Sequence, residues 1–173
     1  MATRPILVLP DMRLRAVADP VDQIDEEVKK LARDMLDTMY AAPGIGLAAP
    51  QVGELRRLVV MDLAKEGEKP DPIIMINPEI LKFSDETVVT EEGCLSIPDL
   101  YYEVERPAEI TVRYTDLEGS SIITDAAERL AICVQHELDH LDGVLYIDYL
   151  SRLKRDRVLK KFEKAERLGK RAG

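Results

Sequence analysis

The sequence has only two histidines and two cysteines among its 173 residues. Two cysteines are too few for a disulfide framework, so cysteine usage indicates a reducing compartment or metal chemistry. No apolar run approaches the roughly eighteen residues that a membrane span requires. Near the start, an apolar run of only four residues lies between two prolines, which is no secretory signal. We therefore expect a cytoplasmic protein.

The length and the charge distribution of the chain limit how it can be organised. A chain of 173 residues predicts a single domain, 1–173, with a sizeable core. No repeat, low-complexity segment or linker divides it. From residue 150 onward, ten Lys or Arg face three acids, whereas the preceding 149 residues carry fourteen bases and thirty acids. The tail of about +7 predicts either a polyanionic partner or a solvated helix with pairs such as Asp156 with Lys160.

Both histidines fall in one short motif. His136 and His140 lie four residues apart in a stretch, 125–142, that is predicted to be helical. Four residues of an α-helix advance about 400°, so the two imidazoles share a face and can bind one ion. Glu137 follows the first histidine, where a carboxylate can reach a metal-bound water and act as general base. The alternative is a chance spacing of surface histidines, which H-E-x-x-H disfavours.

The ends of this helix carry their own signals. Asp125 with Glu128 resembles a capping box, and Gly143 supplies a stop. Apolar residues on one side would pack into the core and leave the imidazoles facing a cleft. Asp139 could orient one of the metal ligands, but we favour its interpretation as an exposed helix acid.

A catalytic ion needs a third protein ligand. Cys133 lies on the same helix as both histidines, and three ligands spread over about 10 Å of one helix cannot converge on one ion. We interpret Cys133 as a small buried residue or pocket wall. Cys94, Glu91 and Glu92 remain, and the sequence favours Cys94 because thiolate is the stronger ligand for a borderline metal.

The remaining elements indicate an α+β fold. Apolar spacing predicts helices over 24–41 and about 151–168, and strands over 58–63, 73–76, 87–90, 110–114, 121–124 and 146–150. We expect antiparallel sheets packed around the central metal-binding helix, flanked by the N-terminal and C-terminal helices. The glycine-rich run 44–53 indicates a tight turn into a strand, and phosphate binding is a weaker alternative.

Three motifs together resemble those of the peptide deformylases. They are GIGLAAPQ at 44–51, EGCLS at 92–96 and QHELDHLDG at 135–143, in the order and with the wide spacing of that family. The resemblance covers nearly the whole chain, including the basic C-terminal helix. It implies that the metal ligands are Cys94, His136 and His140. It also implies that Glu137 is the catalytic acid and base, and that Gln51 and the Leu95 backbone N–H bind the oxyanion.

The resemblance further implies the reaction and its requirements. The family removes the formyl group from the formyl-methionine of nascent polypeptides and releases formate. Its usual ion is ferrous iron, which zinc, nickel or cobalt can replace. The methionine pocket would be formed by Gly46, Ile45, Ile132 and Cys133, and the basic tail could contact ribosomal RNA.

The chain departs from the family pattern at Tyr101, where many members have an arginine, and at Arg129, where many have an apolar residue. Glu92 and Arg106 are expected to pair beside Cys94. Two rival functions remain at this stage, namely an H-E-x-x-H metallopeptidase and a non-catalytic domain whose ion has four protein ligands.

Overall fold

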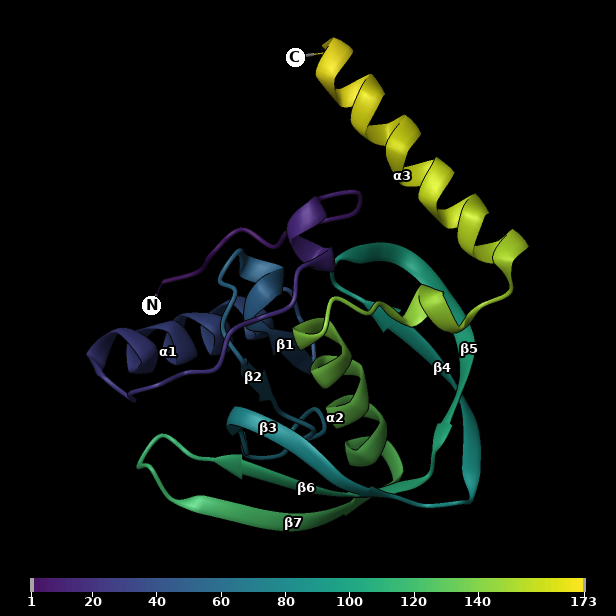
Figure 1. The fold of residues 1–173 in the computed structure, drawn as a ribbon. Coiled ribbons are helices and arrows are strands. Elements are labelled where there is room, and N and C mark those ends of the chain that lie inside the picture. Colours follow the sequence, from purple (N-terminus) through teal and green to yellow (C-terminus); the bar gives the residue numbers. More distant parts are fainter. Residues whose placement is uncertain (1, 173) are drawn as a thin grey trace.

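Two antiparallel sheets surround a central helix. The computed structural model describes the backbone of residues 2–172 and the side chains of residues 2–169, so residues 1 and 173 of the predicted domain lie outside it. One sheet has the order β1-β2-β3-β6-β7, the other is the pair β4-β5, and α2 runs between them (Figure 1). The predicted α+β fold is confirmed. The elements are α1 (Glu26–Ala41), β1 (Gly46–Ala48), β2 (Leu58–Met61), β3 (Ile73–Phe83), β4 (Thr87–Cys94), β5 (Ile97–Pro107), β6 (Glu109–Thr115), β7 (Ser121–Ala127), α2 (Glu128–Leu141) and α3 (Arg152–Ala172).

Helix α1 confirms the helix predicted over 24–41. Asp25 caps it by accepting a hydrogen bond from the Val28 N–H at 3.0 Å, which satisfies one of the free donors of the first turn. Its apolar stripe, including Leu31 and Met35, is fully buried against β1 and β2. This packing fixes the segment 42–46, which leads into β1 and borders the site described below.

Helix α2 begins later than the sequence predicted. The predicted capping box at Asp125 is wrong, because Asp125 belongs to β7 and accepts a hydrogen bond from Thr111 Oγ1 at 2.7 Å. Pairing of β7 with β6 continues to Ala127, which is the N-cap and makes no side-chain capping bond. Residues 125–127, which would otherwise start the helix, therefore pair with β6 instead.

The C-terminal end of α2 agrees with the prediction. Gly143 follows the helix with φ +73°, and a Cβ at this position would overlap the carbonyl of Arg15. Only glycine meets both requirements without strain.

The sequence located most strands but missed two. The predicted runs at 73–76, 87–90, 110–114 and 121–124 lie in β3, β4, β6 and β7, and the run at 58–63 covers β2 but extends two residues past its end. Strands β1 and β5 were not predicted. The predicted strand at 146–150 is wrong, because Tyr146–Tyr149 is a 3₁₀ helix, η3. Tyr146 and Ile147 are both buried although adjacent, and Asp148 accepts a hydrogen bond from the Leu145 N–H at 3.0 Å, which favours a tight turn over a strand.

Helix α3 projects from the body (Figure 1). Val158 and Phe162 anchor its first half in a core cluster with Leu14 and Ile97. Five basic side chains next to these anchors and beyond them are exposed, namely Arg157, Lys160, Lys161, Lys164 and Arg167. In the part of the chain that is described, no helix combines the length and apolarity needed to cross a membrane.

Candidate metal centre

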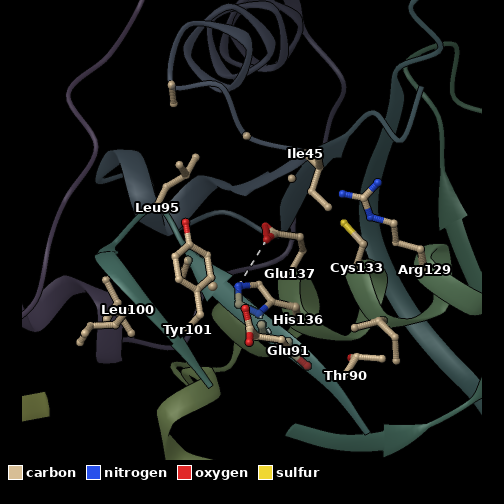
Figure 2. Close-up of a pocket in the computed structure, with 18 of the residues that line it drawn as sticks. Ile45, Thr90, Glu91, Leu95, Leu100, Tyr101, Arg129, Cys133, His136 and Glu137 are labelled. Atoms are coloured by element: carbon tan, nitrogen blue, oxygen red, sulfur yellow. Dashed lines mark hydrogen bonds and ion pairs between the residues drawn. The ribbon is translucent and has the colours of Figure 1, made fainter. Parts of the chain in front are cut away.

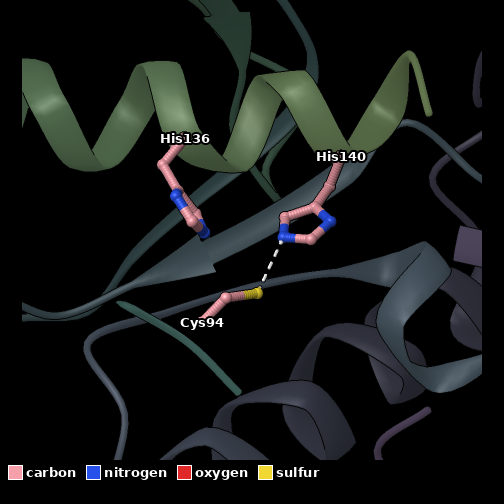
Figure 3. A group of neighbouring side chains, drawn as sticks. All are labelled: Cys94, His136 and His140. Carbon is pink, nitrogen blue, oxygen red and sulfur yellow. Dashed lines mark hydrogen bonds between the residues drawn. The ribbon is translucent and has the colours of Figure 1, made fainter. Parts of the chain in front are cut away.

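The structure brings together three potential metal ligands from distant parts of the chain. The ligand atoms of Cys94, His136 and His140 all lie within 4.8 Å of one another. Cys94 Sγ is 3.3 Å from His140 Nε2, and the two imidazole centroids are 5.2 Å apart (Figure 3). The histidines come from the side of α2 that faces the β4-β5 pair, as their spacing predicted. Glu91 is not part of this cluster.

The end of β4 positions Cys94. The β4-β5 pairing slips between Glu92 and Cys94, and the chain then reverses so that Cys94 pairs with Ile97. Gly93 permits this path, because a Cβ there would come within 2.5 Å of the Tyr101 ring. The aromatic ring thus lies directly on the backbone that precedes the thiol.

His136 is held from behind by a buried carboxylate. Glu92 Oε1 lies 2.9 Å from His136 Nδ1, which leaves Nε2 of this ring for an ion. The same carboxylate forms a two-bond ion pair with Arg106, as expected, and both side chains are buried. Burial opposes ionisation of Glu92, but His136 and Arg106 outweigh it and lower the pKa of its carboxyl. Supporting carboxylates of this kind fix the orientation of a metal-binding imidazole.

Further contacts connect the Glu92–Arg106 ion pair to Asp139 and Tyr149 at the edge of the site. Asp139 accepts hydrogen bonds from Arg106 Nη1 at 2.9 Å and from Tyr149 Oη at 2.8 Å. The Arg106 guanidinium also lies 4.8 Å from the centroid of the Tyr149 ring. The favoured interpretation of Asp139 as an exposed acid is therefore wrong, and the alternative fits better, because Asp139 belongs to a chain of contacts that ends at His136.

Glu137 is buried and points into the site. Its Oε1 lies 3.8 Å from His136 Nε2, and its Oε2 has no hydrogen-bond partner among the described residues. Burial raises the pKa of Glu137 to about 7. Gly46 makes room for this side chain, since a Cβ there would lie 3.1 Å from both Cγ and Cδ of Glu137. A buried carboxyl with a pKa near neutrality can both accept and return a proton.

The Gln51 amide faces the same centre. Its Oε1 accepts a hydrogen bond from the Ala48 N–H at 2.9 Å, which orients its Nε2 as donor. That nitrogen lies 3.1 Å from Ser96 Oγ and 3.6 Å from Cys94 Sγ. Gln51 is only 1% exposed, so its donor is fixed before any ligand arrives.

A cavity of about 1080 Å³ opens beside these groups (Figure 2). All four residues predicted to form the substrate pocket line it, as do Gln51, Leu95, Cys94, His136 and Glu137. The wall beyond Glu137 is mostly apolar. Cys133 is 7% exposed, and burial raises the pKa of its thiol, so that it serves as an uncharged wall as expected. Glu91 lines the cavity from the β4 side.

The donor set fits a divalent metal ion. One thiol and two imidazoles converge, and the Glu92 contact presents His136 through Nε2, the same nitrogen by which His140 faces Cys94. Sulfur and imidazole nitrogen together suit iron, zinc, nickel and cobalt. Three protein ligands beside an open cavity, with a buried carboxyl one residue from the first histidine, define a mononuclear metal-dependent hydrolase.

Comparison with known proteins narrows this class. The sequence profile of the family described as polypeptide deformylase matches residues 3–156. The peptide deformylase of Bradyrhizobium diazoefficiens is 58% identical over 169 residues, covering 95% of this chain and 97% of that protein. The crystal structure of a peptide deformylase from Legionella pneumophila has a TM-score of 0.88 at 44% identity, covering 98% of this chain and 99% of that one. The crystal structure of a peptide deformylase from Ehrlichia chaffeensis in complex with actinonin has a TM-score of 0.90 at 42% identity, covering 96% of this chain and 99% of that one.

The chain belongs to the polypeptide deformylase family. It is therefore a metal-dependent enzyme that removes the N-formyl group from the formyl-methionine of nascent polypeptides. The resemblance drawn from the three sequence motifs is confirmed.

Sequence reasoning missed the outer part of the support for His136. It paired Glu92 with Arg106 but did not connect Arg106 to Asp139 and Tyr149. One signal was present, because Val104 and Arg106 alternate with Glu103 and Glu105, which places Arg106 on the buried face of a strand.

Proposed function

We propose that Cys94, His136 and His140 hold the ion of this deformylase and that Glu137 moves the proton. The observation that carries the proposal is the convergence of the three ligand atoms within 4.8 Å, next to a buried carboxyl that lacks a hydrogen-bond partner in the described chain. A divalent ion bound there would acidify a water molecule and polarise the formyl oxygen.

Glu137 supplies the acid and base chemistry. Its Oε2 accepts the proton of the attacking water and later gives it to the nitrogen of the departing amine, so that formate and a free N-terminus are released. A pKa of about 7 allows this carboxyl to do both near neutral pH. Because Glu137 is buried on α2 beside the site, the proton stays inside the site while it is transferred.

Two donors stabilise the oxyanion that forms when the formyl carbon becomes tetrahedral. One is Gln51 Nε2, which the Ala48 contact fixes in orientation, and the other is the backbone N–H of Leu95. Each such donor contributes about 3 kcal/mol in comparable sites. The methionine side chain lies in the apolar part of the cavity, formed by Ile45, Gly46, Ile132 and Cys133.

Three matched peptides test the proposal and its rivals. A formyl-Met peptide, its acetyl counterpart and its unformylated form are offered to the metal-loaded enzyme, with formate release and peptide-bond cleavage followed in parallel. Formate release from the first peptide alone is expected. Cleavage of internal peptide bonds would favour a metallopeptidase, and no reaction at all would favour a purely structural ion.

The ion in the cell is proposed to be ferrous iron, with one ion per chain. The Cys/His₂ donor set accommodates iron, zinc, nickel and cobalt alike, and iron is favoured by the family resemblance. Anaerobic purification followed by metal analysis and a formate assay tests this choice. A zinc-filled preparation of full activity would overturn it.

Helix α3 is proposed to contact the ribosome. The enzyme is proposed to act in the cytoplasm, as a single catalytic domain. Five exposed basic side chains along 157–167 on a projecting helix supply a cationic surface for RNA phosphate. Replacing Lys160, Lys164 and Arg167 together with Glu should lower the amount of enzyme that co-sediments with ribosomes. The remaining co-sedimentation should depend less on salt concentration. Lys82→Glu, an exposed position on β3, is the control. Unchanged co-sedimentation of the triple variant would remove the contact.

A further inference from the structure

An exposed cationic side chain, Arg129, borders the cavity that contains the proposed methionine pocket. Glu128 is the first residue of α2 that lines the cavity, and the others recur with helical spacing, namely Arg129, Ile132, Cys133, His136 and Glu137. Arg129 lies seven residues before His136, so its Cα is about 10 Å farther along the helix axis. The stripe therefore runs from the metal centre, past the apolar wall, to a guanidinium.

The guanidinium of Arg129 is exposed and is paired with none of the side chains that the structure describes. Within the side chains described, no hydrogen bond or ion pair involves Arg129, and it is the only Lys or Arg that lines the cavity. In Figure 2 it points past the Cys133 sulfur toward Ile45, on the side of the cavity away from Tyr101. Its charge acts on the Cys133 thiol, which places it close to the apolar wall.

The backbone at this point is strained. Glu128, the residue before Arg129, has φ +55°, and it too lines the cavity. A residue with a side chain occupies this left-handed region at a cost of about 1 kcal/mol or more, which the surrounding structure must offset. This strained residue and Arg129 therefore lie side by side at the border of the cavity.

We propose that Arg129 enables the enzyme to deformylate chains that begin with formyl-methionine sulfoxide. This inference rests on the proposed methionine pocket. Oxidation converts the thioether into a polar, chiral sulfoxide whose oxygen is a hydrogen-bond acceptor. An apolar pocket would leave that oxygen unpaired, at a cost in binding, whereas a guanidinium offers several donors to it. Arg129 borders the same cavity one helical turn from Ile132 and Cys133, so we place the oxidised end of the side chain beside its exposed guanidinium.

The chemical step is unchanged by the oxidation. Water adds to the formyl carbon, the bond between that carbon and the amide nitrogen breaks, and the proton passes to the nitrogen. The products are formate and a chain with a free methionine sulfoxide N-terminus. The sulfoxide is neither oxidised nor reduced, so no further reactant is required.

The experiment compares kcat/KM for a formyl-methionine sulfoxide peptide and the formyl-Met peptide, using metal-loaded enzyme. The ratio of the two values is the readout, because it cancels changes common to both substrates. Arg129→Leu should lower this ratio about fivefold or more relative to the wild type, and Arg129→Lys should retain part of it, as expected for loss of a charged hydrogen bond. The two sulfoxide epimers should differ in the wild type and differ less in Arg129→Leu.

Two controls isolate the effect. A formyl-norleucine peptide has no sulfoxide acceptor, so its ratio to formyl-Met should not fall in Arg129→Leu. Arg33→Leu removes an exposed arginine of α1 outside the cavity and should leave every ratio unchanged.

The outcomes separate this inference from the function on which it rests. Absence of formate release from the formyl-Met peptide overturns the proposed function. Release from that peptide with no release from the sulfoxide overturns only the role of Arg129. Equal ratios in the wild type, Arg129→Leu and Arg129→Lys also overturn it.

Discussion

Glu92 Oε1 lies 2.9 Å from His136 Nδ1 and so binds the ring nitrogen that the proposed ion would not use. The carboxylate comes from β4 and the imidazole from α2, so this contact joins the two-stranded sheet to the central helix. The same strand supplies Cys94 two residues later. The orientation of one proposed ligand, His136, and the position of another, Cys94, therefore depend on the same short segment.

Replacing Arg106 with Met should destabilise the fold and weaken metal binding. The carboxylate of Glu92 would remain buried without its cation, which costs about 3–5 kcal/mol. Glu92, the partner of His136, would no longer be held in place by Arg106, and metal affinity should fall about tenfold or more. Urea unfolding and metal titration measure the two effects.

The surface pair Arg113–Glu79 is the matched control for Arg106. Its side chains are 47% and 60% exposed, so Arg113→Met should cost less than about 1 kcal/mol. Equal destabilisation by the two substitutions would contradict the importance assigned to the buried pair.

Glu137→Gln should retain the metal and lose turnover by several orders of magnitude. The amide has nearly the same shape but can neither accept nor return the proton. Metal content by elemental analysis and formate release under saturating substrate provide the two measurements. Near-normal turnover in this variant would end the assignment of Glu137 as acid and base.

The stability of the metal-stripped protein should depend on the ionisation of Glu137. Burial raises its pKa from 4.5 to about 7, so the folded chain holds this proton more tightly than the unfolded chain. The stabilisation is fully present below about pH 4.5 and is lost as the pH rises through about 7, amounting to about 3 kcal/mol.

Glu137→Gln lacks this titration. Urea midpoints at pH 5 and pH 8 in the presence of chelator and reductant should therefore show a smaller decline for the variant than for the wild type. Parallel declines in the two proteins would exclude a raised pKa at this carboxyl.

Cys94→Ser should release the metal far more readily than Cys133→Ser. Both thiols border the cavity, but only Cys94 lies within ligand distance of the histidines. A hydroxyl is a weaker ligand than a thiolate for these ions. Residual metal after dialysis against a chelator distinguishes the variants, and equal retention would argue against Cys94 as a ligand.

The sequence predicted the parts of the fold that local pattern controls. The H-E-x-x-H spacing located the ligand face of α2, and thiolate chemistry favoured Cys94 over nearby acids. The start of α2 could not be predicted from Asp125, because the β6-β7 ladder extends through that residue. Nor could the contacts of Asp139, because Arg106 and Tyr149 reach it from β5 and η3 only after the chain has folded.

The division of the strands into separate sheets has a mechanical consequence. Cys94 ends the small β4-β5 sheet, which has no strand pairing with the larger sheet in the described chain, whereas both histidines belong to α2. An ion at this centre would add a further link between the β4-β5 pair and α2, beside the Glu92–His136 and Arg106–Asp139 contacts. Loading with metal should accordingly slow amide exchange along β4 by more than along β7, at the far edge of the larger sheet.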